Sequence, residues 1–304
     1  MRKTGQLLAA ALIAGVIGLA VLLFGPSIIA PKGPIIEGVS EETHVGDRVE
    51  KPLYIGFIPQ GNAVFMVRKW QPLADYLARE LGMPVEMVFR SSYRDIITAL
   101  SHGEMDICLT GAFMYVLTRE NADIHPLVRR KKFGSSQYYS VIVVRKESGI
   151  EGIEDLKGKS FAFTDKESTT GYLLPMAMMR QQGIHDPERY FSEVIYTGNH
   201  DSALLAVFTQ RMQAAAMSST RWQPENPRIK ELKIIWKSAP IFLGPFSVRA
   251  GLDKTLEQRI KNAFLRIGTT PDTQALSEHI QIEGFEEAGD RDYDSIRRVR
   301  AWMF

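Results

Sequence analysis

The sequence predicts a two-lobed α/β protein that is preceded by an N-terminal signal or anchor helix. Three observations carry this prediction. Residues 4–31 contain no charged side chain, strand-like and helix-like segments alternate along the rest of the chain, and a longer strand-like run, Gln137 to Val144, interrupts the alternation. Alternating strands and helices are typical of a mostly parallel sheet with helices on both faces. Two such series with a long strand between them indicate two lobes and a cleft.

The first thirty residues are predicted to be a targeting segment. Arg2 and Lys3 precede an apolar run over residues 7–24, and a basic start followed by an apolar run is the pattern of a secretory signal. About 18 to 20 apolar residues also suffice to cross a bilayer, and Pro31 is a poor residue directly after a cleavage point. Residues 1–30 are therefore either a cleaved signal peptide or an uncleaved signal-anchor helix. In both cases the basic end stays in the cytoplasm and the rest is periplasmic or otherwise extracytoplasmic.

Residues 31–51 contain turn formers and mixed charge, and we expect them to be a linker. The first alternating series follows it. In the helix after the first strand, Trp70, Leu73 and Leu77 share one face, and Gly82 ends the pattern. The expected strands of this series are Leu53–Ile58, Val85–Phe89, Met105–Leu109 and Ile124–Val128, and the expected helices are Phe65–Leu81, Tyr93–Leu100 and Phe113–Arg119.

The second series begins after the long run. Its short apolar segments, bounded by turn formers, predict buried strands. The strands are Ser160–Phe163, Val194–Tyr196, Gln213–Met217, Leu232–Trp236 and Phe246–Val248. The helices are Thr169–Gln182, Ser202–Gln210, Leu256–Ile267, Pro271–Ile280 and Tyr293–Trp302.

Composition excludes several classes of protein. With 45% apolar and 24% charged residues among 304, the chain is neither disordered nor collagen-like nor a polytopic membrane protein. Its 37 Lys and Arg against 35 Asp and Glu lack the basic excess of a nucleic-acid surface. The single cysteine, Cys108, cannot form an intramolecular disulfide, and no Cys/His spacing indicates zinc. No nucleophile or nucleotide-loop motif occurs, so we expect no enzyme, no metal and no cofactor.

The chemistry is expected at helix starts. Ser168, Thr169, Thr170 and Gly171 lie where a strand leads into a helix. One hydroxyl suffices to cap a helix, whereas the free amides and the dipole of a helix N-terminus bind oxyanions readily. The three hydroxyls and the amides around Gly171 therefore indicate an oxyanion site, with an ordinary capped helix as the alternative. At a second helix start, His200 either donates to an oxyanion or caps its own helix.

A collinear series of short segments runs from about Tyr54 to Tyr293. The segments are Gly56–Pro59, Trp70–Leu77, Ser92–Tyr93, Asp106–Tyr115, Tyr138–Lys146, Asp155–Lys159, Phe163–Pro175, Gly183–Ile184 and Gly198–Asp201. This series resembles the phosphate/phosphite/phosphonate-binding proteins of ABC transporters, the PhnD-like group of periplasmic binding proteins.

The resemblance implies the type II periplasmic binding protein fold, with two crossing strands near Gln137–Val144 and Ile241–Val248. Lobe 1 would be residues 52–138 plus 243–304, and lobe 2 residues 139–242. A monomer would capture phosphate, phosphite or a small phosphonate in the interlobe cleft and deliver it to an ABC permease. The alternative is a membrane-tethered sensor or interaction module that uses the same oxyanion-binding fold and is anchored through residues 7–24.

The resemblance also implies site residues. In such proteins a helix-start Ser-Thr-Ser, two tyrosines and a histidine hold the phosphonyl oxygens. The matching residues here are Tyr93, Tyr138, Ser168, Thr169, Thr170 and His200. Where aminoalkyl-phosphonate binders place acids, this sequence has Arg221 and, near the second crossing strand, Gly244. A cation repels an ammonium group, so an aminoalkyl ligand is disfavoured. Arg221 either adds charge-assisted bonds to an oxyanion or lies on the surface.

Overall fold

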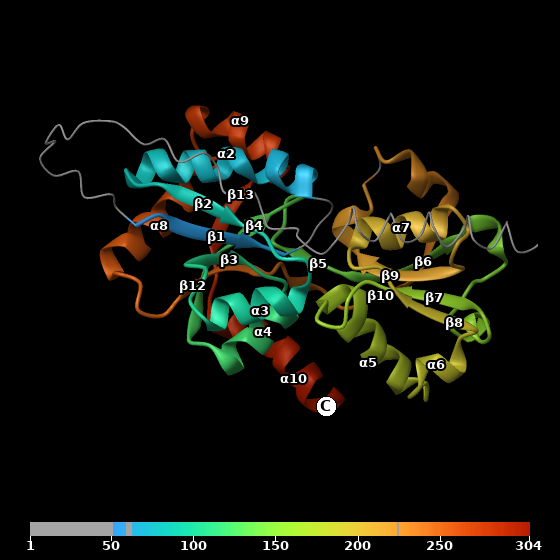
Figure 1. Cartoon of the computed structure of the whole chain (residues 1–304). Helices are drawn as coiled ribbons and strands as arrows, with labels where there is room; N and C mark the ends of the chain where they lie inside the picture. The colour runs from blue at the N-terminus through green and yellow to red at the C-terminus, as the bar shows by residue number, and fades with distance from the viewer. Residues whose placement is uncertain (1–50, 59–62, 224) are drawn as a thin grey trace, which may run out of the picture. The chain divides into compact units, whose positions relative to one another are not determined.

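The computed structural model describes residues 51–58, 63–223 and 225–304 (Figure 1). The expected leader, and the expected linker apart from Lys51, lie outside these residues. Within the described ranges, no helix is both long and apolar enough to cross a membrane.

The first sheet has six strands in the order β13-β4-β12-β3-β1-β2. They are β1 (Leu53–Phe57), β2 (Val85–Val88), β3 (Ile107–Leu109), β4 (Ile124–Lys131), β12 (Pro245–Arg249) and β13 (Gly284–Glu287). Strands β2, β1 and β3 pair in parallel, whereas β12 is antiparallel to both β3 and β4. The sheet is therefore mixed, because β12 returns from elsewhere in the chain and not through a helical crossover.

Helices cover both faces of this sheet (Figure 1). They are α2 (Ala63–Leu81), α3 (Tyr93–Ser101), α4 (Ala112–Asn121), α8 (Lys254–Arg266), α9 (Pro271–His279) and α10 (Asp294–Met303), the last preceded by the short helix η6 (Asp290–Tyr293). The predicted apolar face of α2 is buried. Trp70 stacks on Phe57 at 4.7 Å between ring centroids, and Phe246 of β12 meets both rings edge-on. This aromatic group fixes α2 against two strands of the sheet.

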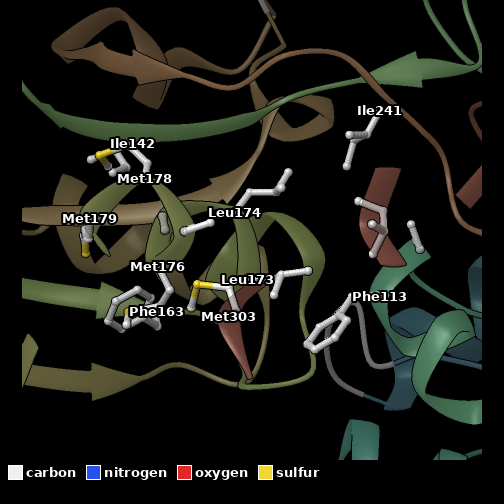
Figure 2. Packing of buried hydrophobic residues seen from close by; sticks show 14 of the residues in the cluster. Phe113, Ile142, Phe163, Leu173, Leu174, Met176, Met178, Met179, Ile241 and Met303 are labelled. Carbon is white, nitrogen blue, oxygen red and sulfur yellow. The ribbon is translucent and has the colours of Figure 1, made fainter. Parts of the chain in front are cut away.

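The second sheet has five strands in the order β10-β6-β9-β7-β8. They are β6 (Ser140–Arg145), β7 (Ser160–Phe163), β8 (Glu193–Tyr196), β9 (Ala214–Ser218) and β10 (Leu232–Lys237). Helix α7 (His200–Phe208) lies on one face, and α5 (Leu174–Gln181) and α6 (Pro187–Tyr190) lie on the other (Figure 1). Figure 2 shows the methionines of α5, among them Met176 and Met179, close to Phe163 of β7 in one apolar cluster. The same cluster contains Phe113 of α4 and Met303 of α10, so apolar packing is continuous between the two sheets.

Two crossing strands connect the sheets. Strand β5 (Gln137–Tyr138) pairs antiparallel with β11 (Ile241–Phe242), and Tyr138 lies opposite Ile241. The expected single strand from Gln137 to Val144 is interrupted at Tyr139, because the chain changes its pairing partner there. Its first part pairs with β11, and its second part, β6, enters the second sheet between β10 and β9. The fold is that of type II periplasmic binding proteins.

Candidate oxyanion-binding site

A cavity of about 60 Å³ lies beside the crossing strands. A water-sized group needs about 10–15 Å³ of such space, so the cavity has room for about four to six groups of that size. This matches a tetrahedral oxyanion, which has five non-hydrogen atoms. The predicted residues on its wall are Tyr93, Tyr138, Ser168, Thr169, Thr170, His200 and Arg221. The geometry thus brings together residues that are distant in sequence.

Ser168 forms the cap of the predicted helix. It is extended, and its Oγ accepts a hydrogen bond from the amide of Gly171 at 3.0 Å. This amide is therefore used within the protein, and Gly171 does not line the cavity. The role of Gly171 is close packing, because a Cβ there would lie 2.1 Å from Thr164 Oγ1. A hydroxyl donates one hydrogen bond as well as accepting, so Ser168 still has a hydrogen to direct into the cavity.

The helix begins with a π-helical turn, η3 (Thr169–Leu173), before α5. The amide of Leu173 bonds to the carbonyl of Ser168, five residues earlier. Such wide turns occur frequently at functional sites. Both threonines of the turn are almost completely buried. Thr169 Oγ1 accepts from the amide of Phe113 in α4 at 2.8 Å, so this hydroxyl joins a helix of the first sheet to the helix start of the second.

The two tyrosines reach the cavity from separate elements. Tyr93 is the first residue of α3, whose cap is Ser92, and Tyr138 lies in β5. Burial raises the pKa of Tyr138 to about 12 and raises the pKa of Tyr93 well above its ordinary value. Both phenols are therefore protonated at neutral pH and can donate a hydrogen bond to an anion.

His200 is a neutral donor and not a helix cap. The cap of α7 is Asn199, whose side chain accepts from the amide of Ser202 at 2.9 Å. His200 Nδ1 accepts from the amide of Ser218 at 3.3 Å, which places the ring proton on Nε2. Desolvation, and then the charge of Arg221, lower the pKa of His200 to about 3. The ring thus offers an N–H donor without a charge.

Arg221, in the short helix η4 (Ser219–Arg221), is not a surface residue. Its side chain is 15% exposed and lines the cavity, and Nε lies 3.4 Å from an Asp201 carboxylate oxygen. The alternative that Arg221 lies on the solvent-exposed surface is therefore wrong.

Three further cations line the cavity that the sequence did not predict. Lys69 comes from α2, and Arg130 and Lys132 come from β4 and the residue after it. All three are buried. Burial lowers the pKa of Lys69 and of Lys132 to about 7, and their positive neighbours add to the effect. The sequence signal for two of them is the run Arg129 to Lys132. Alternate residues of a strand face the same side, so a strand that continues through this run places Arg130 and Lys132 on one side. A strand expected to end at Val128 leaves these residues in a loop.

A family model described as "ABC transporter, phosphonate, periplasmic substrate-binding protein" matches residues 55–293. The chain belongs to this family. Its members are substrate-binding components of transporters, not enzymes, and they act outside the cytoplasm.

Two relatives with similar sequences are named for binding or importing phosphorus compounds. The phosphonates-binding periplasmic protein of Escherichia coli K12 is 28% identical over 263 residues, covering 82% of this chain and 76% of the relative. The phosphate-import protein PhnD of Mycolicibacterium smegmatis is 28% identical over 261 residues, covering 81% and 78%. In fold, the chain matches PhnD1 of Prochlorococcus marinus, solved with methylphosphonate, at a TM-score of 0.76 and 20% identity, covering 83% of this chain and 98% of that one.

The surroundings of Gly244 leave no space for a side chain. A Cβ there would lie 2.0 Å from the carbonyl oxygen of Thr110 and 2.7 Å from backbone atoms of Gly111. The two positions at which the resemblance places acids thus hold a partly buried arginine and a residue without a side chain. The cavity wall therefore has cationic and neutral groups where an ammonium ion would need carboxylates.

Proposed function

We propose that this protein captures a phosphorus oxyanion, namely phosphate, phosphite or a small phosphonate, and delivers it to an ABC permease. The observation that carries the proposal is the convergence of the Ser168–Thr170 hydroxyls with Tyr93, Tyr138 and His200 on one small cavity. The relatives are named as phosphonate-, phosphate- and phosphite-binding proteins, which supports this ligand class.

The mechanism we infer is reversible binding with hinge closure between lobe 1 (52–138 and 243–304) and lobe 2 (139–242). Lobe 2 supplies the three hydroxyls, His200 and Arg221, and lobe 1 supplies Tyr93 and Tyr138. Removing an anion from water is costly unless several good donors replace its hydration. Protonated phenols, hydroxyls and the neutral imidazole offer those donors from both lobes. An anion that contacts both sides stabilises the closed form, which would then dock on the permease.

Calorimetry with the full chain tests the proposal. Phosphate, phosphite and methylphosphonate are titrated separately, with nitrate and acetate as anions that lack a tetrahedral oxyanion centre. We expect at least one phosphorus oxyanion to bind and neither control to compete with it. Saturable binding of acetate or nitrate with no response to any phosphorus compound would refute the proposed ligand class.

A further inference from the structure

Three buried cations of the cavity have no countercharge among the residues that the structure describes. Lys69, Arg130 and Lys132 are 7%, 8% and 8% exposed. In the described part of the chain, no carboxylate oxygen lies within ion-pairing distance of any of them. Nε of Arg130 has no hydrogen-bond partner at all there. Charged side chains are almost never fully buried unless they are paired, and an uncompensated buried charge is strongly destabilising. Lys69 lies over the rings of Phe65 and Trp70, and Lys132 lies over the ring of Phe133, but a ring supplies no countercharge. The three groups therefore point to an anionic partner that the described residues do not supply.

The cations form one electrostatic group together with Arg221. The charges of Lys132, Arg221 and Arg130 all act on Lys69, and those of Arg130 and Arg221 act on Lys132. The carboxylate of Asp201 raises the pKa of both lysines, but it is already close to Arg221. When the lysines are protonated, Asp201 offsets one of four positive charges. A single phosphoryl dianion would offset two more and leave the group still positive.

The neutral donors and the cations occupy different elements. The hydroxyls and His200 lie at the starts of η3 and α7, whereas Lys69 belongs to α2, Arg130 belongs to β4, and Lys132 directly follows β4. A neighbouring hollow of about 240 Å³ also has Lys132, Tyr138, Thr220 and Leu243 on its wall. A substituent on the phosphorus atom thus has space beside Lys132, outside the small cavity.

We propose that the ligand is a phosphorus compound with two acidic groups: a phosphoryl head held by the neutral donors, and a carboxylate or second phosphoryl group near Lys132, where the small cavity adjoins the hollow. This proposal rests on the proposed function and narrows its ligand class. The second acid supplies part of the countercharge that Lys69, Arg130 and Lys132 lack among the described residues.

The test compares ligands that differ only in the charge of the second group. Calorimetry at pH 7 uses 3-phosphonopropionate and its neutral amide, 3-phosphonopropionamide, with methylphosphonate as the single-acid reference. Methylenediphosphonate is the arm with a second phosphoryl group, and succinate is the arm without phosphorus. We expect one of the two diacids to bind at least tenfold more tightly than both methylphosphonate and the amide.

Variants locate the effect. Lys132→Met and Lys69→Met remove one cation each and keep most of the apolar stem, and Lys131→Met removes the same charge from the neighbouring position. Lys131 does not line the cavity, and its side chain alternates to the other side of β4. We expect the advantage of the diacid to fall at least fivefold in the Lys132 and Lys69 variants and to persist in the Lys131 variant.

The outcomes separate this proposal from the broader one. If methylphosphonate or the amide binds as tightly as the tighter-binding of the two diacids, the proposal of a second acid is refuted, while the proposed function stands. The proposal of a second acid is likewise refuted if Lys131→Met lowers the affinity of the diacid relative to methylphosphonate as much as Lys132→Met does. If succinate binds as tightly as 3-phosphonopropionate, the phosphoryl head is unnecessary, and both proposals fail. The ligand comparison in the unaltered protein is decisive even if a variant does not fold.

Discussion

Replacing Ser168 with alanine separates the two roles that the structure gives to its hydroxyl. The oxygen caps the helix by accepting from the amide of Gly171 at 3.0 Å, and the hydrogen is available to the cavity. Loss of an N-cap costs about 1 kcal/mol of stability, which in a domain of this size lowers Tm by about 2–4 °C. Loss of a hydrogen bond to a charged ligand costs about 1.5–3 kcal/mol, or about 10- to 150-fold in Kd.

The matched control is Asp253→Ala. Asp253 caps α8 by accepting from the amide of Leu256 at 2.9 Å, and it does not line the cavity. Both variants are compared with the unaltered protein by thermal unfolding without ligand and by calorimetry with the tightest phosphorus ligand. We expect both to lose similar stability and only Ser168→Ala to lose affinity. Unchanged affinity in Ser168→Ala, or an equal loss in Asp253→Ala, would refute the assignment of this helix start as the oxyanion site.

The same cavity leads to four further predictions. Lys69 and Lys132 have a pKa of about 7 in the folded chain, so between pH 7 and about 10.5 the unfolded chain binds more protons than the folded chain. The free energy of unfolding without ligand therefore rises with pH in this window. Thermal scans of wild type and Lys132→Met should show a weaker rise in the variant. Affinity for methylphosphonate should fall over that window more in wild type than in Lys132→Met, and equal pH slopes by calorimetry would contradict this. 2-Aminoethylphosphonate should bind more weakly than propylphosphonate, its isostere without the ammonium charge, because Arg221 repels that charge. The difference should shrink in Arg221→Met; tighter binding of the amine would exclude this role. Gly244→Ala should cost about 1–3 kcal/mol of stability in denaturant unfolding, because its Cβ meets the Thr110 carbonyl, and a neutral result would show that β12 can shift.

Local patterns predicted most of the elements, and long-range pairing decided the rest. Strand β7 (Ser160–Phe163) matches its expected bounds because a buried apolar run between turn formers identifies it without reference to the rest of the chain. Strand β13 was not predicted, because Gly284–Glu287 has one large apolar residue and two acids. Its position comes from pairing with β4, where Arg129 forms a 2.6 Å ion pair with Glu286. Strand β11 was expected only from the resemblance, as part of a crossing strand near Ile241–Val248, which the structure divides into β11 and β12. Helix α6 was not predicted, because it has no periodic pattern of its own.

The same distinction applies to the candidate site. The hydroxyls from Ser168 to Thr170 could be proposed as an oxyanion site from the strand-to-helix transition, with an ordinary capped helix as the alternative, because the chemistry of a helix start is local. The tyrosines came from the resemblance, since nothing adjacent in sequence relates them, and the resemblance also favoured the donor role of His200 over a helix cap. Lys69 could not be found in either way, because a basic side chain is normally solvated, and Lys132 was missed because the preceding strand was expected to end at Val128. Only the tertiary fold shows that these two lie buried on the wall of the same cavity.

The distribution of charge around the cavity links binding to the arrangement of the lobes. Arg221 comes from the second sheet's side of the site, and Lys69, Arg130 and Lys132 come from elements of the first sheet. Bringing the two sides together without an anion places like charges near one another, which costs free energy that grows as water is excluded. An anion between them reverses the sign of that interaction. A ligand shifts a conformational equilibrium only through its differential affinity for the two states. In the hinge closure that we propose, these cations would therefore make closure depend on an anionic ligand, whereas hydroxyls alone would allow the empty site to close at little cost.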